Sequence, residues 1–189
     1  MLELMITLTL AGLIMGIGVP AFRNFAKNGR LTGAANEMLV TIVSARNEAV
    51  RRQLRTSFCP STTPDADLAI CASTATQGYI AFVDLNSNCQ RDVGEEIISN
   101  FVVHSEVTSK KNLTCIGFGS NGFRIPTTGN PSNARAVFCD SRGIAKVTPS
   151  STDSVARGVE IVGTGRPAVT RLFADLNTWA GGATPVTCP

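Results

Sequence analysis

The stretch LMITLTLAGLIMGIGVPAF, residues 4–22, decides the fold because it holds no charged side chain and leads directly into an amphipathic helical pattern. Glu3 precedes this run and Arg23 follows it. A helix of about 19 residues matches the ~30 Å hydrocarbon core of a bilayer. The stretch is therefore either a transmembrane span or the buried core of a filament.

The charges around the run indicate whether it is a cleaved signal peptide and whether it has a function. No Lys or Arg precedes it, whereas a secretory signal peptide has a basic region before its apolar stretch, so we expect the segment to stay in the mature protein. An ionisable residue at the end of such a run is costly and points to a function, which makes Glu3 a candidate for pairing with a cation at the same depth. The alternative is an ordinary single-span anchor with a boundary Glu.

The helical pattern continues past the run. Apolar residues recur at alternating steps of four and three on one face: Leu31, Ala35, Met38, Ile42, Ala45 and Ala49. Pro20, Gly29 and Gly33 should bend or loosen this helix rather than end it. We predict one helix over residues 2–55, about 80 Å long. A compact domain of this size does not need such a rod, so half of it should belong to a larger assembly.

Several stretches resemble one protein family. MLELMITLTLAGLIMGIGVPAFRNF (1–25) resembles the N-terminal segment of type IV pilins and type II secretion pseudopilins. ARNEAVRRQ (45–53) and GYIAFVDLNSNCQRDVGEEII (78–98) are similar to the GspH/FimT subfamily of minor pilins and pseudopilins. FCDSRGIAKV (138–147), ARGVEIVGTGRP (156–167) and the terminal Thr-Cys-Pro look like FimT and FimU. Together these stretches cover most of the chain.

The resemblance implies an α+β type IV pilin fold, in which a long N-terminal helix with a transmembrane first half packs on an antiparallel β-sheet head. Residues 1–27 would form the transmembrane or filament-core half, and residues 28–189 the periplasmic or extracellular head. In the family a peptidase removes a basic leader before a Phe, and a Glu near the new N-terminus pairs with a neighbouring N-terminus. Glu3 occupies that Glu position, and by this pattern the chain starts slightly inside the usual mature protein. The residues expected to serve filament assembly are Glu3, Leu4, Pro20 and Phe22.

The function that the resemblance implies is that of a structural subunit, a minor pilin or pseudopilin of a type IV pilus or a type II secretion pseudopilus. Its partners would be other pilin subunits and, before assembly, the inner membrane, which it would cross once with its head in the periplasm. After assembly it would lie on the cell surface in the pilus. Two alternatives remain open: a FimT-like DNA-binding minor pilin for natural transformation, and the major pilin of a filament.

The sequence gives no support to an enzymatic function. Gly-x-Ser-x-Gly, a phosphate-binding glycine loop and His-Glu-x-x-His are all absent from it. The single histidine, His104, falls at the end of a predicted strand without a nucleophile motif around it, so we expect a surface residue. We therefore expect no catalytic residues, no small-molecule substrate and no cofactor, with calcium as the one possible exception.

The six cysteines are expected to form disulfides, because they contain no Cys-x-x-Cys pair and a single histidine cannot complete the usual zinc patterns. Disulfides place the head outside the cytoplasm. Many pairings are open, and short separations are the easiest to close, which favours Cys59 with Cys71, Cys89 with Cys115, and Cys139 with Cys188. The resemblance supports only the last pair, since pilins commonly staple their C-terminal region.

From Gln77 onward the chain alternates short apolar runs with turn residues, which predicts one antiparallel sheet packed on the C-terminal half of the long helix. The predicted strands are 78–85, 96–103, 113–118, 122–125, 134–140, 143–148, 157–163 and 168–173. Residues 60–76 and 127–133 read as surface loops. With 189 residues, 43% hydrophobic and 16% charged, the chain can bury one core, so we expect a single head domain.

One polar stretch matches the ligand spacing of an EF-hand loop. Oxygen-bearing side chains fall at its first, third, fifth, seventh, ninth and twelfth positions: Asp84, Asn86, Asn88, Gln90, Asp92 and Glu95. Cys89 stands where the sharp turn needs Gly, and the predicted flanks are strands rather than helices. A polar hairpin turn is the favoured interpretation, and Ca²⁺ binding, which would stiffen the hairpin, is the alternative.

A basic C-terminal region is the last candidate site. Its cations are Arg142, Lys146, Arg157, Arg166 and Arg171. FimT-type pilins can act as DNA receptors through a Gly-Arg-x-Arg signature. Here Gly165-Arg166-Pro167 is followed by Ala168, and the next arginine is Arg171. The net charge of +3 is mild, so the alternative is an ordinary solvated face.

Overall fold

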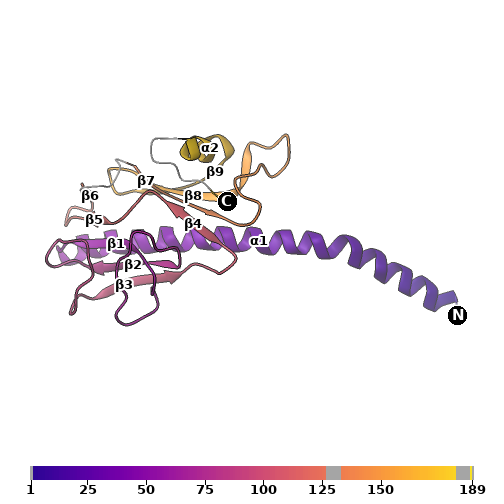
Figure 1. The fold of residues 1–189 in the computed structure, drawn as a ribbon, viewed down its shortest axis with the longest axis horizontal. Coiled ribbons are helices and arrows are strands. Elements are labelled where there is room, and N and C mark those ends of the chain that lie inside the picture. Colours follow the sequence, from indigo (N-terminus) through magenta and orange to yellow (C-terminus); the bar gives the residue numbers. More distant parts are fainter. Residues whose placement is uncertain (1, 127–132, 182–187, 189) are drawn as a thin grey trace.

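The computed structural model describes residues 2–126, 133–181 and 188. A long helix, α1 (Leu2–Arg52), carries a head of two antiparallel sheets at its C-terminal half, and its N-terminal half extends beyond the head in a gentle curve (Figure 1). The first sheet has the order β3 (Ile97–Val102), β2 (Gly78–Val83), β1 (Thr56–Ser61), β5 (Ile116–Phe118), β6 (Arg124–Ile125). The second has the order β4 (Thr108–Lys111), β7 (Ala134–Cys139), β8 (Asp153–Ile161), β9 (Pro167–Leu172), followed by helix α2 (Phe173–Gly181).

The long helix confirms the prediction of one unbroken rod, since Pro20, Gly29 and Gly33 all lie inside α1. The helix ends at Arg52, slightly before the predicted end at Arg55. Gln53 stops it by adopting a left-handed conformation with φ of 56°. The side-chain amide of Gln53 then donates a hydrogen bond to the Val50 carbonyl, at 2.7 Å, and so satisfies one of the last helical acceptors.

The predicted apolar face of α1 is the centre of the core. Leu31, Ala35, Met38, Ile42, Ala45 and Ala49 are all fully buried. Three of these six are alanines, which allow strands to approach the helix closely. Tyr79 stacks between Phe58 and Phe101, with ring centroids 5.3 Å away on each side, and its hydroxyl lies 2.6 Å from that of Ser109. Burial raises the pKa of Tyr79, so this phenol stays neutral.

The structure corrects the prediction of a single sheet. The strands form two separate antiparallel sheets, and α1 contacts strands of both. Residues 60–76 are also not simply a surface loop: Pro60 and Ser61 belong to β1, and Ala69 and Ala75 are buried. The predicted strand 143–148 forms only one isolated bridge, between Lys146 and Ser154. Of the predicted loop 127–133, residues 127–132 lie outside the described part of the chain.

A close backbone approach makes Gly78 sensitive to substitution. A Cβ atom at this position would lie 2.2 Å from the Phe101 carbonyl oxygen and 2.6 Å from Cγ of Pro64. Since Gly78 pairs with Val102 on β3, Gly78→Ala must push β2 and β3 apart. We expect the free energy of unfolding to fall by about 1–3 kcal/mol, measured by urea denaturation in detergent with the disulfides intact.

Gly29→Ala is the matched control for Gly78→Ala. Gly29 is an exposed helical residue, and a Cβ atom added to it would meet no heavy atom within 4 Å, so the same substitution should stabilise α1 by up to about 1 kcal/mol. Equal effects of the two substitutions would contradict the assignment of Gly78 to a crowded strand pair.

Candidate functional site

The N-terminal half of α1 is an apolar surface without cover from the head. Every side chain that the structure describes from Leu2 to Phe25 is exposed, including Phe22 at 71%. By length and composition α1 is long and apolar enough to cross a membrane, and none of its most apolar window is buried. An apolar surface of this extent needs a nonpolar partner, either lipid or the helices of other subunits.

The residues predicted for assembly all lie on this surface or within its helix. Glu3 is in the first turn of α1 and exposed, and Leu4 is exposed beside it. Pro20 lies inside the helix, and its side chain is outside the described part of the structure. The hydroxyls of Thr7 and Thr9 donate to helix carbonyls, which removes the cost of placing them in a nonpolar environment.

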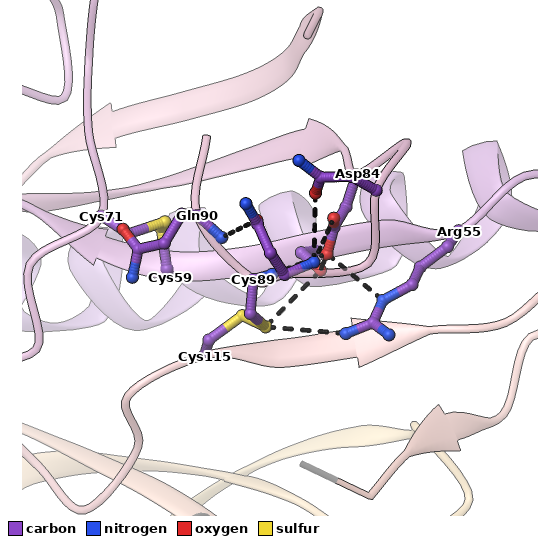
Figure 2. Close-up of a disulfide and its surroundings, with 10 residues drawn as sticks. Arg55, Cys59, Cys71, Asp84, Cys89, Gln90 and Cys115 are labelled. Carbon is purple, nitrogen blue, oxygen red and sulfur yellow. Dashed lines mark hydrogen bonds and ion pairs between the residues drawn. A yellow bond between two sulfur atoms is a disulfide. The ribbon is translucent and has the colours of Figure 1, made fainter. Parts of the chain in front are cut away.

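The loop that follows β2 is organised around a buried carboxylate (Figure 2). Asp84 is fully buried and accepts hydrogen bonds from the Ser57 hydroxyl at 2.5 Å and from the Asn88 and Cys89 amides at 3.1 and 3.2 Å. Arg55 Nε lies 3.2 Å from the same carboxylate, while its Nη2 points at the Cys89 sulfur, 3.8 Å away. One carboxylate therefore joins the segment between α1 and β1, strand β1 and the loop.

Four of the other five predicted calcium ligands use side-chain polar atoms within the loop, and the fifth, Gln90, is bonded through its backbone amide. Asn86 and Asn88 both donate side-chain amide hydrogen bonds to Asp92, at 2.7 and 2.8 Å. Glu95 accepts from the amides of Leu85 and Asp92, and the Gln90 amide donates to Asn88 Oδ1. Within the described residues no group of three or more His, Cys, Asp or Glu side chains is placed to hold a metal. These contacts describe a self-bonded polar turn, and Ca²⁺ binding stays a prediction.

All six cysteines form disulfides, in the connectivity favoured by the sequence. Cys59–Cys71 ties β1 to the segment after it, and Cys89–Cys115 ties the polar loop to the start of β5. Cys139–Cys188 joins the end of β7 to the chain beyond α2, over a separation of 49 residues. The last bond holds α2 against the second sheet, where Leu176 and Trp179 are buried.

The five C-terminal cations are not one group. Arg166 is exposed in the turn between β8 and β9, whereas Arg171 lies at the far end of β9 and pairs with Asp153 at 3.2 Å. Arg157 is only 6% exposed and donates to three backbone carbonyls and to Thr32. Lys146 lies over the Phe173 ring, 5.4 Å from its centroid. The structure thus separates Arg166 from the others, and DNA binding stays a prediction.

Comparison with known proteins decides the family. The model of the family described as type II transport protein GspH matches residues 34–165, well over half of the chain. The chain belongs to the GspH family. The match begins on the buried face of α1 and ends at the turn after β8, so it covers most of the head. A search of curated proteins gives no match.

Solved structures of a minor pilin and a minor pseudopilin are similar to this GspH family member. The type IV minor pilin FimU of Pseudomonas aeruginosa matches with a TM-score of 0.51 and 21% identity, over 77% of this chain and 92% of FimU. A second crystal form of FimU matches with a TM-score of 0.49 and 20% identity, over 74% of this chain and 92% of FimU. The minor pseudopilin EpsH of Vibrio cholerae matches with a TM-score of 0.48 and 6% identity, over 75% of this chain and 97% of EpsH. The FimU match with a TM-score of 0.51 confirms the predicted α+β pilin fold.

The family and the fold together show the role of the chain. It is a pilin-like structural subunit, of a type IV pilus or of a type II secretion pseudopilus, as the sequence predicted.

His104 is exposed, in line with a surface residue, and its Nδ1 accepts a hydrogen bond from the Glu106 amide at 3.2 Å.

Proposed function

We propose that this GspH family member is a minor subunit that crosses the inner membrane once through residues 4–22, keeps its head outside the cytoplasm, and enters a filament by exchanging lipid for neighbouring helices. The observation that carries the proposal is the apolar half of α1, which is continuous with the core helix of the head yet covered by nothing in the described part of the chain. Lipid and the helices of other subunits are both nonpolar partners, so either can cover it.

Two features bear on the orientation in the membrane. Arg23 and Lys27 follow the span on the head side, and positive charge beside a span ordinarily favours the cytoplasm. Three disulfides weigh against that orientation, because they persist in an oxidising compartment and not in the cytoplasm. We therefore place the head outside the cytoplasm and regard the cations beside the span as serving another purpose.

Glu3 supplies the polar element of assembly. A carboxylate in a nonpolar filament core is strongly unfavourable alone, and a cation on a neighbouring subunit offsets that cost. Because the pair forms in a single axial register, Glu3 would also fix how far each subunit rises relative to the next.

Glu3→Ala tests this assembly role. We expect the filament-associated fraction of the protein to fall at least about tenfold, since losing one partner of a buried pair costs more than the ~1.4 kcal/mol that tenfold represents. The measurement is an immunoblot of sheared filaments against cell membranes, in cells that express the complete pilus or pseudopilus machinery.

Glu37→Ala is the matched control, because Glu37 is an exposed carboxylate on the head half of α1. It should leave the filament fraction unchanged, and both variants should keep the thermal unfolding midpoint of the wild-type head. Normal filaments from Glu3→Ala would refute the pairing, and a chain that never enters the membrane fraction would refute the proposed anchor.

A further inference from the structure

A cluster of cations lies at the end of the head that faces the apolar half of α1. Arg142 Nη2 donates to Asn28 at 2.9 Å, and Arg157 Nε donates to Thr32 at 3.2 Å. Both contacts fall within about three helical turns of Phe22, where the uncharged run ends. We name this cluster the juxtamembrane basic surface; its members are Lys27, Arg142, Lys146, Arg157 and Arg171.

The hairpin that carries part of this surface extends toward the N-terminal half of α1. Residues 144–152 follow β7 and lead into β8, and the orange part of the ribbon in Figure 1 reaches along the helix in that direction. Lys146 and Val147 are exposed on it. The turn between β8 and β9 lies at the other end of the head, because Gly165 is close to Gly122, which in turn is close to Arg46 and Val50 of α1.

The charge of this surface is unbalanced. Its five cations face two carboxylates, Asp140, which pairs with Arg142, and Asp153, which pairs with Arg171. Among the described residues no carboxylate lies within 4.0 Å of Lys27, Lys146 or Arg157 in an ion pair. The surface therefore has a net charge of +3, the same as the whole chain. The other twelve cations and twelve carboxylates of the chain are equal in number.

The cations are held in place before any partner arrives. Two Arg142 nitrogens, Nε and Nη2, donate to the Asp140 carboxylate, and Arg157 is fixed by three carbonyls. Burial opposes ionisation of Asp140, but its hydrogen bonds with Arg142 outweigh this and lower its pKa. Lys146 and Arg171 are exposed at the rim, with Arg171 at half exposure. Buried cations held by fixed hydrogen bonds, together with exposed cations at the rim, suit an anionic surface because little conformational entropy is lost on contact.

We propose that the juxtamembrane basic surface binds the headgroups of anionic phospholipids in the membrane that α1 spans. The inference rests on the proposed membrane insertion. If residues 4–22 fill the hydrocarbon core, Asn28 lies about 9 Å beyond it, within the headgroup region and one Debye length of the lipid phosphates. A duplex nucleic acid would have to enter between the head and the bilayer to reach the same cations.

Lipid binding here would restrain the head before assembly. Each Lys or Arg near an anionic surface strengthens the contact about fivefold, so the exposed cations of this surface would favour one orientation of the head on its helix. Extraction of the subunit into a filament then breaks these contacts together with the lipid contacts of α1. In this proposal the cations beside the span bind lipid headgroups on the exported side of the membrane.

Hydrogen exchange of the full chain in lipid nanodiscs tests the proposal. The nanodiscs contain phosphatidylcholine alone or with phosphatidylglycerol, and the readout is the exchange of backbone amides in residues 144–152. We expect anionic lipid to slow this exchange at least about fivefold. The Lys146→Gln, Arg171→Gln double variant should lose most of that protection. The matched control, Arg51→Gln with Arg166→Gln, removes two exposed cations remote from the surface and should keep it.

The outcomes separate the two proposals. A chain that does not enter either nanodisc refutes the proposed anchor, and with it this inference. A chain that inserts but shows equal exchange in both lipids refutes the lipid surface alone. The same protection by a short DNA duplex in phosphatidylcholine nanodiscs, without any effect of phosphatidylglycerol, would assign the surface to nucleic acid and also overturn the proposal.

Discussion

Asp84→Ala is expected to lower the free energy of unfolding by about 3–5 kcal/mol, because it removes one partner from a buried ion pair and leaves the other without compensation. Asp84 has no exposed surface, and the Arg55 side chain is only 17% exposed. The substitution also leaves the Ser57 hydroxyl and the Cys89 amide without their Asp84 acceptor, while the Asn88 amide keeps only its bond to Asn86 Oδ1 (Figure 2). Each buried donor that loses its partner costs free energy.

Chemical denaturation in detergent, with all three disulfides oxidised, measures this effect. Asp92→Ala is the matched control, since Asp92 is an exposed carboxylate in the same loop that accepts two side-chain amide hydrogen bonds. Hydrogen bonding from Asn86 and Asn88 lowers the pKa of Asp92, yet its exposure means that the substitution should cost clearly less than Asp84→Ala. Asp84→Asn removes the charge but keeps the shape of the side chain. Its loss in free energy of unfolding should lie between those of Asp84→Ala and Asp92→Ala.

If Asp84→Ala and Asp92→Ala destabilise the protein equally, Asp84 is not the residue that organises the loop. The same experiment bears on the predicted calcium site. A polar turn stabilised by its own hydrogen bonds should show the same unfolding midpoint in Ca²⁺ and in chelator, whereas a cation site would gain stability with Ca²⁺.

Removing the Cys139–Cys188 disulfide should have the second large effect. Serine at both positions releases a loop of 49 residues, for which chain entropy gives a loss of about 4 kcal/mol. The bond also keeps α2 near the second sheet, where Trp179 packs with Val137, Ala156 and Leu176. Trp179 is the only tryptophan in the chain, so its fluorescence reports directly on whether α2 stays docked.

We expect the emission of Trp179 to shift to the red in the serine variant and the denaturation midpoint to fall. The control replaces Cys59 and Cys71, which close a separation of only 12 residues, so the expected loss is about 3 kcal/mol and the tryptophan signal should not change. An unchanged Trp179 spectrum in the Cys139, Cys188 variant would show that packing alone holds α2.

The head shows where prediction from sequence ended. The runs that became β2, β3, β7 and β9 were recognised because their residues are apolar or β-branched and lie between turn residues. β1 and β4 were missed because TSFCPS and TSKK are rich in polar residues. Their Ser57, Ser61 and Ser109 are buried only because the neighbouring strands surround them, which no local pattern reveals.

The candidate sites divide in the same way. The spacing from Asp84 to Glu95 predicted a polar turn, with a cation loop as the alternative. The structure adds that Arg55 and Ser57, from the chain before and within β1, are partners of Asp84. The spacing of Arg166 and Arg171 suggested one basic site, whereas the length of β9 keeps them at opposite ends of the strand. Arg142 and Arg157 are distant in sequence from Lys27, and they approach its part of α1 only because β8 and the segment after β7 pack on the helix.

The long helix, its buried face, its uncovered apolar half and the family could all be predicted from the sequence, because they depend on local hydrophobic periodicity and on motifs contiguous in the chain. The division into two sheets, the burial of Asp84 against Arg55 and the gathering of positive charge beside the apolar half of α1 became visible in the tertiary structure alone. These features depend on contacts between residues far apart in sequence, whose geometry is set by how the strands pack around α1.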